Sequence, residues 1–288
     1  MNVKDFIRLL SYPFIKFYFF INPIKITVNS LDGTLDKLIN SDRSIIRFGD
    51  GELKLISGKS ICFQSYTGSL AKDLDNVIRQ NEDNLLIALP DIFNKNNLTY
   101  KAKLFWNFDL FLKQKYYRRI PSRPYENAFL SRPYMDYIDK ESKISFFNKM
   151  KTLWVNKNIV FIEGDATRNG VNNDLYTNAK SIKRIICPSK NSYSIKEKII
   201  GYVKENIEKD SLICLSLGPA AKVIGYELYK MGYRVLDLGH LDSEYEWCLC
   251  KAKKKIRIEG KHTAEHNDDN INACTDENYL SQILVSFV

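Results

Sequence analysis

The sequence lacks the features of a secreted or membrane-spanning protein. No uncharged run in its N-terminal segment approaches the ~20 apolar residues that a spanning helix needs. No signal-peptide cleavage pattern is visible. Three of the six cysteines lie in or beside apolar runs, which favours buried free thiols over a disulfide framework. We therefore expect a protein of the reducing cytoplasm.

Complete fingerprints for ATP, dinucleotides or zinc are also missing. Residues 58–60 read Gly-Lys-Ser, like the end of a phosphate-binding loop, but Leu53 occupies the position where that loop needs glycine. The chain has three histidines, and His262 and His266 lack the glutamate that follows the first histidine of zinc proteases. These absences weigh against an ATP loop and against a zinc protease.

The composition fits a soluble globular protein with anionic partners. Hydrophobic residues make up 44% of the 288 residues and charged residues 27%, which weighs against disorder. The net charge of +9 favours phosphorylated ligands, acidic lipids or nucleic acid. Basic and aromatic residues interleave only near the N-terminus, and no nucleic-acid recognition motif is present. We therefore expect no nucleic-acid partner.

Residues 1–25 form an aromatic and basic segment that is interrupted by Pro13 and Pro23. Lysine and arginine interleaved with phenylalanine and tyrosine are typical of a helix that lies in the membrane interface. A helix that packs on the domain or on a partner subunit would have the same composition. The sequence leaves both interpretations open.

The rest of the chain alternates between apolar runs and helical patterns. Strands are expected at 44–48, 84–90, 127–131, 158–164, 184–188, 211–218 and 233–239, and helices at 69–80, 100–117, 135–154, 194–209 and 219–232. This rhythm predicts an α/β fold with a mostly parallel sheet flanked by helices. We expect one domain over 26–260 and a polar, irregular tail over 261–288.

Asp50-Gly51-Glu52 directly follows the first strand of this domain. Active sites of open α/β sheets gather at the carboxyl ends of strands. Two carboxylates separated by glycine can converge on one hard cation such as Mg²⁺ or Mn²⁺. The alternative is a charged turn in which the aspartate caps a helix. Arg47, inside the strand, needs a partner because a buried unpaired cation is costly.

Two further strand ends carry candidate substrate-binding residues. The loop 161–174 contains Glu163, Arg168, Asn173 and Asp174, and it is either a substrate edge or a solvated connection. The joint 216–228 passes through the sequence Gly218, Pro219 and Ala220. Such a joint would present helix amides to a diphosphate, or it is an ordinary turn.

The last strand end offers titratable groups. His240, Asp242 and Glu244 follow it, and a histidine or carboxylate there could act as a general base. Acidic residues at a helix start would look the same, because the helix dipole favours them there. Residues 251–257 then supply five cations, on a solvated helix face or in contact with phosphate or membrane.

Four separated segments, taken together and in order, resemble the bacterial GT-D type glycosyltransferase family. They are 47–52, 131–136, 163–176 and 218–247. The resemblance implies a Rossmann-like fold and sugar transfer from a nucleotide diphosphate donor. It also implies that Asp50 and Glu52, as the family's Asp-x-Glu motif, bind Mn²⁺ or Mg²⁺.

The leading hypothesis is therefore a metal-dependent hexosyltransferase that uses UDP-glucose or a related UDP-sugar. The acceptor would be a glycan, glycolipid or glycoprotein, and the protein would be cytoplasmic or peripheral on the inner face of the membrane. Expected site residues are Asp50 and Glu52 for metal; Arg47, Arg168, Asn173, Asp174, Gly218, Pro219, Ala220 and His240 for substrate; and Asp242 or Glu244 as base, with Glu163 and Asp174 not excluded. The alternatives are a metal-dependent phosphoesterase and a non-catalytic, membrane-associated binding module.

Overall fold

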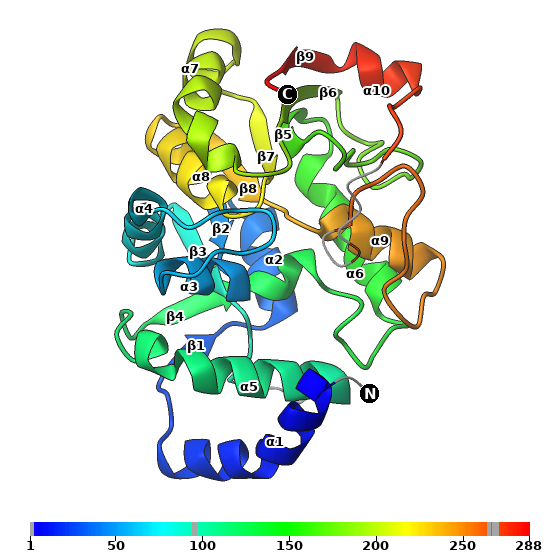
Figure 1. The fold of residues 1–288 in the computed structure, drawn as a ribbon. Coiled ribbons are helices and arrows are strands. Elements are labelled where there is room, and N and C mark those ends of the chain that lie inside the picture. The colour runs from blue at the N-terminus through cyan, green and yellow to red at the C-terminus, as the bar shows by residue number, and fades with distance from the viewer. Residues whose placement is uncertain (1–2, 94–96, 264–265, 267–270) are drawn as a thin grey trace.

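One parallel β-sheet runs through the molecule (Figure 1). The computed structural model describes residues 3–93, 97–263, 266 and 271–288. Within these residues the strand order is β1-β4-β3-β2-β8-β7-β5-β6-β9, and the pairs between neighbouring strands are parallel. The strands are β1 Thr27–Val28, β2 Ser44–Arg47, β3 Leu85–Leu89, β4 Pro124–Asn127, β5 Asn158–Gly164, β6 Ser181–Cys187, β7 Leu212–Ser216, β8 Arg234–Asp237 and β9 Ile283–Ser286. The predicted fold class is confirmed.

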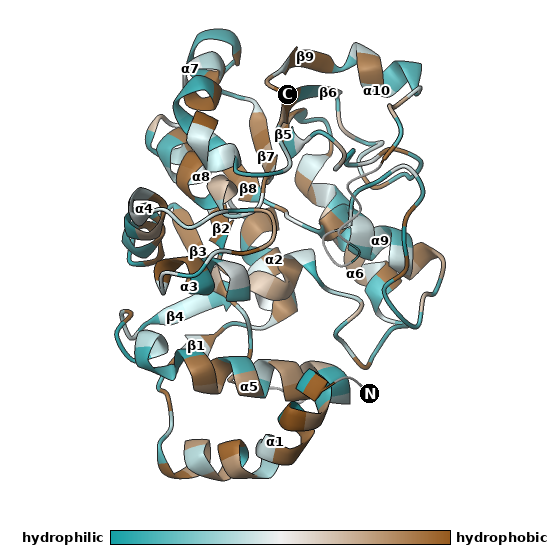
Figure 2. Ribbon diagram, in the orientation of Figure 1, coloured by the Kyte–Doolittle hydropathy of each residue, from teal (hydrophilic) through white to brown (hydrophobic). Residues whose placement is uncertain are grey.

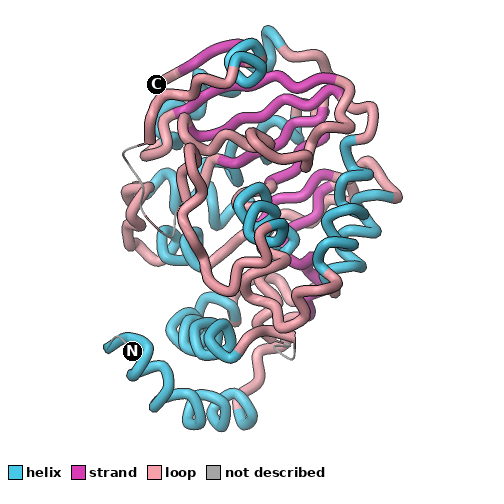
Figure 3. Tube along the Cα trace, turned by 90° about the vertical axis from the view of Figure 1, so that its right-hand side faces the viewer, coloured by secondary structure: helices cyan, strands magenta, loops and turns pink. Residues whose placement is uncertain are grey.

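Helices cover both faces of the sheet, as Figures 1 and 3 show. The α-helices are α1 Val3–Ile21, α2 Leu31–Ile39, α3 Asp50–Ile56, α4 Gly68–Ile78, α5 Tyr100–Tyr117, α6 Lys143–Met150, α7 Lys196–Asn206, α8 Ala220–Lys230, α9 Leu241–Leu249 and α10 Glu277–Ser281. Three 3₁₀ turns are η1 Ala128–Ser131, η2 Lys151–Trp154 and η3 Ser192–Ile195. Helices α4, α7 and α8 pack together on one face, and α2, α6 and α9 lie on the other. Every residue of β2, β3 and β7 is buried, as expected for strands covered on both sides.

Two expected elements near the middle of the chain are wrong in part. Residues 127–131 were expected as a strand, but β4 ends at Asn127 and η1 follows. The Asn127 side chain accepts the Phe129 amide at 3.0 Å, so it replaces the ladder with a local turn. The helix expected over 135–154 begins only at Lys143.

The polar tail is more ordered than its composition predicts. Helix α10 and strand β9 lie within 277–286, and β9 pairs with β6 at the sheet edge. The expected irregular structure is therefore wrong for these residues. Residues 264–265 and 267–270 of the tail lie outside the described part of the chain.

The N-terminal segment forms the bent helix α1, which contains Pro13 and packs against α5 (Figures 1 and 3). The Tyr18 hydroxyl donates to Gln114 Oε1 at 2.6 Å, and Ile15 is buried. Figure 2 colours much of α1 as hydrophobic. Among the described residues, neither α1 nor any other helix combines the length and the apolar character needed to cross a bilayer.

Candidate active site

The candidate site lies where β2 and β8 meet at the centre of the sheet. These strands come from opposite halves of the chain, and they pair through Ile45 and Leu236. The helix α3 follows β2 on one face, whereas α9 follows β8 on the other (Figure 1). Such a divergence opens a crevice beyond the carboxyl ends of the strands. A pocket of about 1060 Å³ lies there.

Four buried side chains at the base of this pocket form what we call the central charge cluster: Arg47, Glu52, Lys222 and Asp237. Arg47 Nη2 lies 2.8 Å from Asp237 Oδ1, and Lys222 Nζ lies 3.0 Å from Asp237 Oδ2. Lys222 Nζ also lies 3.4 Å from Glu52 Oε1. The cluster thus balances two cations with two carboxylates and gives Arg47 the partner that its burial requires.

Asp237, a residue that the sequence analysis did not single out, is the centre of this cluster. Burial tends to raise its pKa, but the neighbouring charges of Arg47 and Lys222 outweigh burial and hold the pKa below its usual value. Gly239, just after β8, has a φ of +50°, and a Cβ there would lie 2.2 Å from Arg47 Nη2. Glycine is therefore needed at 239 for the arginine to reach Asp237.

The two carboxylates of the predicted metal motif lie on the first turn of α3 and differ in freedom. Glu52 Oε2 accepts the Gly49 amide at 2.7 Å and so caps the helix. Asp50 is one-third exposed and pairs with Lys54 at 2.6 Å. Burial raises the pKa of Asp50, but the hydrogen bond from Lys54 and the nearby charge of Lys113 outweigh it, so the pKa is lowered.

These carboxylates fit a divalent cation in donor type but supply few ligands. Glu52 Oε2 is committed to the Gly49 amide, which leaves Oε1, while the more exposed Asp50 is paired with the half-exposed Lys54. Across the described ranges no cluster of three His, Cys, Asp or Glu side chains could surround a metal. Mg²⁺ and Mn²⁺ are often held by one or two carboxylates, with the remaining ligands supplied by substrate phosphates and water. The set therefore fits a cation that arrives with a phosphorylated ligand.

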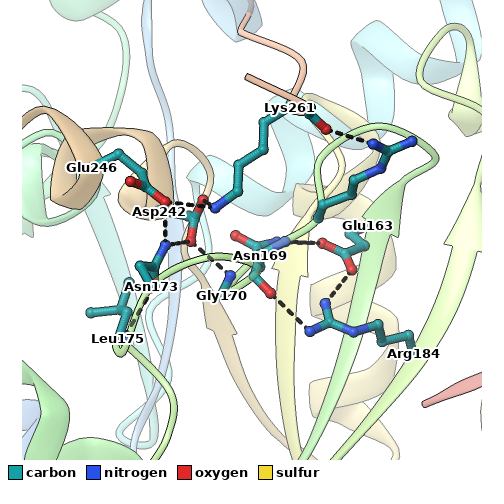
Figure 4. A network of polar contacts seen from close by, with 11 residues as sticks. Glu163, Asn169, Gly170, Asn173, Leu175, Arg184, Asp242, Glu246 and Lys261 are labelled. Atoms are coloured by element: carbon teal, nitrogen blue, oxygen red, sulfur yellow. Dashed lines mark hydrogen bonds and ion pairs between the residues drawn. The ribbon is translucent and has the colours of Figure 1, made fainter. Parts of the chain in front are cut away.

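A second group of polar residues, shown in Figure 4, ties the tail to α9; we call Asn173, Asp242, Glu246 and Lys261 the tail network. Asp242 and Lys261 are buried, and Asn173 and Glu246 are half-buried. Asp242 Oδ1 accepts the Gly170 amide at 2.7 Å and the Asn173 side chain at 2.8 Å. Lys261 Nζ lies 2.6 Å from Asp242 Oδ2 and 3.0 Å from Glu246. Asp242 lines the pocket, but three donors already hold its carboxylate.

The four candidate residues of the loop 161–174 have partners within the protein, whereas Thr167 and Asn169 of the same loop line the pocket. Glu163 Oε1 lies 2.5 Å from Arg184 (Figure 4), and Asp174 pairs with Lys151 at 2.7 Å. Arg168 donates to the carbonyl oxygens of Gly260 and Asn272, and thereby holds the tail. The structure thus gives Glu163, Arg168, Asn173 and Asp174 internal partners, and none of the four lines the pocket.

The joint before α8 brings only one of its three candidate residues to the pocket. Gly218 lines it, with a φ of +51° and the Phe63 ring packed where a Cβ would stand. Pro219 and Ala220 are buried behind Gly218 and do not line the pocket. The expectation that the small Ala220 leaves helix amides accessible is therefore wrong.

Of the candidate residues after β8, some line the pocket and one does not. His240 and Asp242 line the pocket. Glu244 is buried beside it, and its Oε2 accepts the amides of Tyr134 and Met135, each at 2.8 Å. Burial raises the pKa of Glu244 to about 7. Its carboxylate is therefore held by two backbone amides, and Glu244 does not line the pocket.

The pocket wall carries more cations than carboxylates. Among the residues that the structure describes, ten basic ones line it, namely Arg8, Arg47, Lys54, Lys101, Arg132, Lys140, Lys222, Lys253, Lys254 and Lys255, against four acidic ones, Asp50, Glu52, Asp136 and Asp242. The run 251–257 starts beyond the end of α9, so the expectation of a helix face is wrong. Three of its lysines face the pocket, which agrees with the alternative of phosphate contact.

Comparison with known proteins identifies the family to which this fold belongs. A family model for the glycosyltransferase GT-D fold matches residues 45–266, and the chain belongs to this family. Among curated relatives, glycosyltransferase GlyD of Streptococcus pneumoniae serotype 4 is 42% identical over 266 residues, which is 90% of this chain and 32% of the relative. The probable glycosyl transferase Gly of Streptococcus gordonii is 43% identical, over 91% of this chain and 39% of the relative. The chain thus spans less than half the length of either relative.

Solved structures agree closely with the fold. A structure described as a new glycosyltransferase, DUF1792, from Streptococcus sanguinis has a TM-score of 0.87 at 42% identity, over 91% of this chain and 100% of that one. Another, described as the domain of unknown function 1792 with a distinct glycosyltransferase fold, has a TM-score of 0.87 at 39% identity and matches 91% of this chain and 96% of that one. The resemblance that the four motifs suggested is confirmed.

Proposed function

We propose that this protein transfers a hexose from a nucleotide diphosphate donor, UDP-glucose or a related UDP-sugar, to a hydroxyl of a glycan, glycolipid or glycoprotein. The proposal includes a divalent cation, Mn²⁺ or Mg²⁺, held by Asp50 with Glu52. It also includes a cytoplasmic location at the inner face of the membrane. Membership of the GT-D family supports sugar transfer as the reaction class.

The single observation that carries the donor class is the charge of the pocket wall. Within the described part of the chain, ten cations and four carboxylates line it. A diphosphate carries concentrated negative charge, and convergent cations in a partly enclosed site attract it. Because the central charge cluster is internally neutral, this attraction comes from rim residues such as Arg132, Lys253 and Lys254.

Sugar transfer breaks the bond between the anomeric carbon and the departing diphosphate, so negative charge grows on the phosphate oxygens. Preorganised cations placed where that charge develops lower the barrier. A cation bound at Asp50 would add Lewis-acid stabilisation of the same leaving group. The central charge cluster keeps Glu52 and Arg47 in place through Asp237 and Lys222.

The acceptor hydroxyl needs a base that lies in the pocket. Of the carboxylates suggested by the sequence, Asp242 lines it, whereas Glu163, Asp174 and Glu244 do not. Asp242 is already bound by three donors, which weakens it as a base. The candidates for the base are therefore Asp242, Asp136 and His240, and the pH profile of kcat/KM for a neutral variant at each position separates them.

The test is metal-dependent hydrolysis of UDP-sugars, together with thermal stabilisation by UDP. We expect Asp50→Asn to lower Mn²⁺-dependent hydrolysis by about 10-fold to 100-fold, a range typical of losing one charge-stabilising group. Asp75→Asn is a matched control, because Asp75 also pairs with a cation four residues later, Arg79, on an exposed helix face. The control should keep full hydrolysis.

Three outcomes would count against the proposal. Hydrolysis by Asp50→Asn at the wild-type rate and with the wild-type metal dependence would remove the metal assignment. A panel of nucleotide sugars that yields neither hydrolysis nor stabilisation would remove the donor class. Release of phosphate from simple phosphomonoesters would favour the alternative of a phosphoesterase on the same carboxylates.

A further inference from the structure

Helix α1 has two faces with different partners. Residues of one face lie on α5: Ile15 is buried, the Tyr18 hydroxyl donates to Gln114, and the Arg8 guanidinium lies 4.9 Å from the Phe105 ring centroid. This face holds the helix on the domain. The interpretation that α1 packs on the domain is therefore confirmed for one side of the helix.

The opposite side of α1 is apolar and exposed; we call it the apolar face. Its members follow one another at alternating spacings of four and three residues, and between 48% and 76% of each is exposed. That spacing places them in one stripe along a helix. The stripe consists of Val3, Ile7, Leu10, Phe14, Phe17 and Ile21, with Phe6 and Phe20 exposed beside it.

The charges around the apolar face are basic. Lys4, Lys16 and Lys25 are exposed. At 3.6 residues per turn, Lys4 and Lys16 fall on opposite flanks of the helix. The one acidic residue before position 32 is Asp5, and it is paired with Arg8 at 3.0 Å.

We propose that the apolar face of α1 docks on an anionic membrane surface. A stripe of phenylalanine and aliphatic residues with lysines on its flanks suits the boundary between acyl chains and acidic headgroups. A second copy of the chain suits it less, because two apposed stripes would bring the flanking lysines of both copies together. Segment 1–31 has no unpaired acidic side chain to neutralise them.

Docking would place the active site beside the lipid. Arg8, Lys101 and Phe105 line one end of the pocket, so this end reaches the α1–α5 pair. An α-helix is about 10–12 Å wide with its side chains. This end of the pocket would therefore lie roughly one helix diameter from the headgroups. This step rests on the proposed transferase function, and it specifies the acceptor class as a hydroxyl carried on a lipid.

Flotation of the full chain with vesicles tests the docking. We expect binding to vesicles of phosphatidylcholine mixed with phosphatidylglycerol, and weaker binding to phosphatidylcholine alone. Phe14→Gln with Phe17→Gln should weaken binding at least about tenfold, because the buried apolar area is lost. The matched control is Leu280→Gln on α10, an exposed leucine at the opposite end of the molecule (Figure 1).

A second pair of variants tests the charge. Lys4→Glu with Lys16→Glu should remove the preference for phosphatidylglycerol. The control, Lys198→Glu with Lys204→Glu, makes the same change of charge on two exposed residues of α7 and should keep it. Equal vesicle binding by wild type and the phenylalanine variant would overturn the proposal. A concentration-dependent dimer that the same variant abolishes would also overturn it, in favour of a second copy.

Donor hydrolysis without vesicles separates this inference from the proposed function. The α1 variants should hydrolyse UDP-sugars like wild type, since the apolar face does not line the pocket. Vesicle binding without any hydrolysis would remove the proposed function alone. For the acceptor class, long-chain alkyl glycosides in vesicles are compared with the methyl glycosides of the same sugars. The phenylalanine variant should lose transfer to the long-chain alkyl glycosides and keep transfer to the methyl glycosides. If it transfers equally well to both, the proposal of a lipid-borne acceptor is wrong.

Discussion

The central charge cluster and the tail network occupy the same edge of the sheet and use the same kinds of residues, yet they serve different ends. The central cluster joins residues of β2, α3, α8 and β8, and three of its four members line the pocket. The tail network joins α9 to Lys261 and to a loop after β5, and only Asp242 reaches the pocket. In both, nearly every charge is buried and paired. The less buried charges, such as Lys254 and Asp50 with its half-exposed partner Lys54, lie at the rim of the pocket.

This comparison separates residues that build the site from residues that bind in it. Burying an ionic group without a partner is costly, so a buried charge whose partners are all internal mainly stabilises the fold. An exposed charge adds little to stability and remains available to a ligand. Substitutions in the two clusters should therefore mainly lower stability, and those of Glu52 and Asp242 should lower activity as well, because these two are also proposed for the metal and the base. Substitutions at the rim should mainly change donor binding.

Asp237→Ala should have the largest effect on stability. It leaves Arg47 and Lys222 buried with only Glu52 to balance them. Breaking such a buried ion pair typically lowers the free energy of unfolding by about 3–5 kcal/mol. Urea unfolding measures this loss of unfolding free energy. Asp75→Ala is the exposed control, for which we expect a change below about 1 kcal/mol. A small loss in Asp237→Ala would show that the central cluster is not structural.

Glu244→Gln should change how stability depends on pH. Burial raises the pKa of Glu244 from 4.5 to about 7, so between these values the folded state binds more protons than the unfolded state. Stability contributed by this proton is full below pH 4.5 and is lost as the pH rises toward 7. At one pKa unit per 1.36 kcal/mol, the loss is at most about 3 kcal/mol.

Glutamine keeps one oxygen to accept the amides of Tyr134 and Met135, so the variant should lack this loss and be the more stable form at pH 8. Urea unfolding at pH 5 and pH 8 gives the comparison, and Glu227→Gln on the exposed side of α8 is the control. An unchanged slope between pH 5 and pH 8 would mean that Glu244 titrates near its ordinary value.

Lys261→Met tests the tail network. It removes the cation from Asp242, which still accepts two hydrogen bonds, from Gly170 and Asn173. The remaining donors should limit the loss of unfolding free energy to about 2–3 kcal/mol, below that of a fully unpaired charge. Urea unfolding measures this loss of free energy, and limited proteolysis measures how well the tail beyond residue 261 is protected. A tail that stays protected at wild-type stability would contradict the role given to Lys261.

Local signals in the sequence were sufficient to predict most strands of the sheet. Apolar runs bounded by turn residues gave β2, β3 and β5, and threonines at the N-caps of α4 and α5 agree with where those helices begin. The tail failed because its strand β9 is an edge strand that alternates between half-buried and exposed residues. A four-residue segment of this kind gains its order from pairing with β6, and the sequence does not show that β6 lies beside it.

The site was predictable where chemistry follows a strand directly, as at Asp50 and Glu52. It was not predictable where a role depends on a distant partner. Arg168 looked like a substrate ligand, but it binds carbonyl oxygens 92 and 104 residues further along the chain. Asp237 had one signal in the sequence: it is a carboxylate between Leu236 and Leu238, and like Arg47 at the end of β2 it needs a buried partner.

We expect the smallest effect from substitutions of the exposed lysines at the rim of the pocket. Lys253→Ala with Lys254→Ala should raise KM for a UDP-sugar about threefold to tenfold with little change in kcat, because exposed lysines attract the donor and bind ground state and transition state alike. Added salt should shrink the difference, since exposed charges are screened. Lys198→Ala with Lys204→Ala on α7 is the control for charge alone. If the rim variant unfolds earlier in urea, or if kcat falls as far as KM rises, then these lysines act as the central cluster does, and the division between building and binding residues fails at residues 253–254.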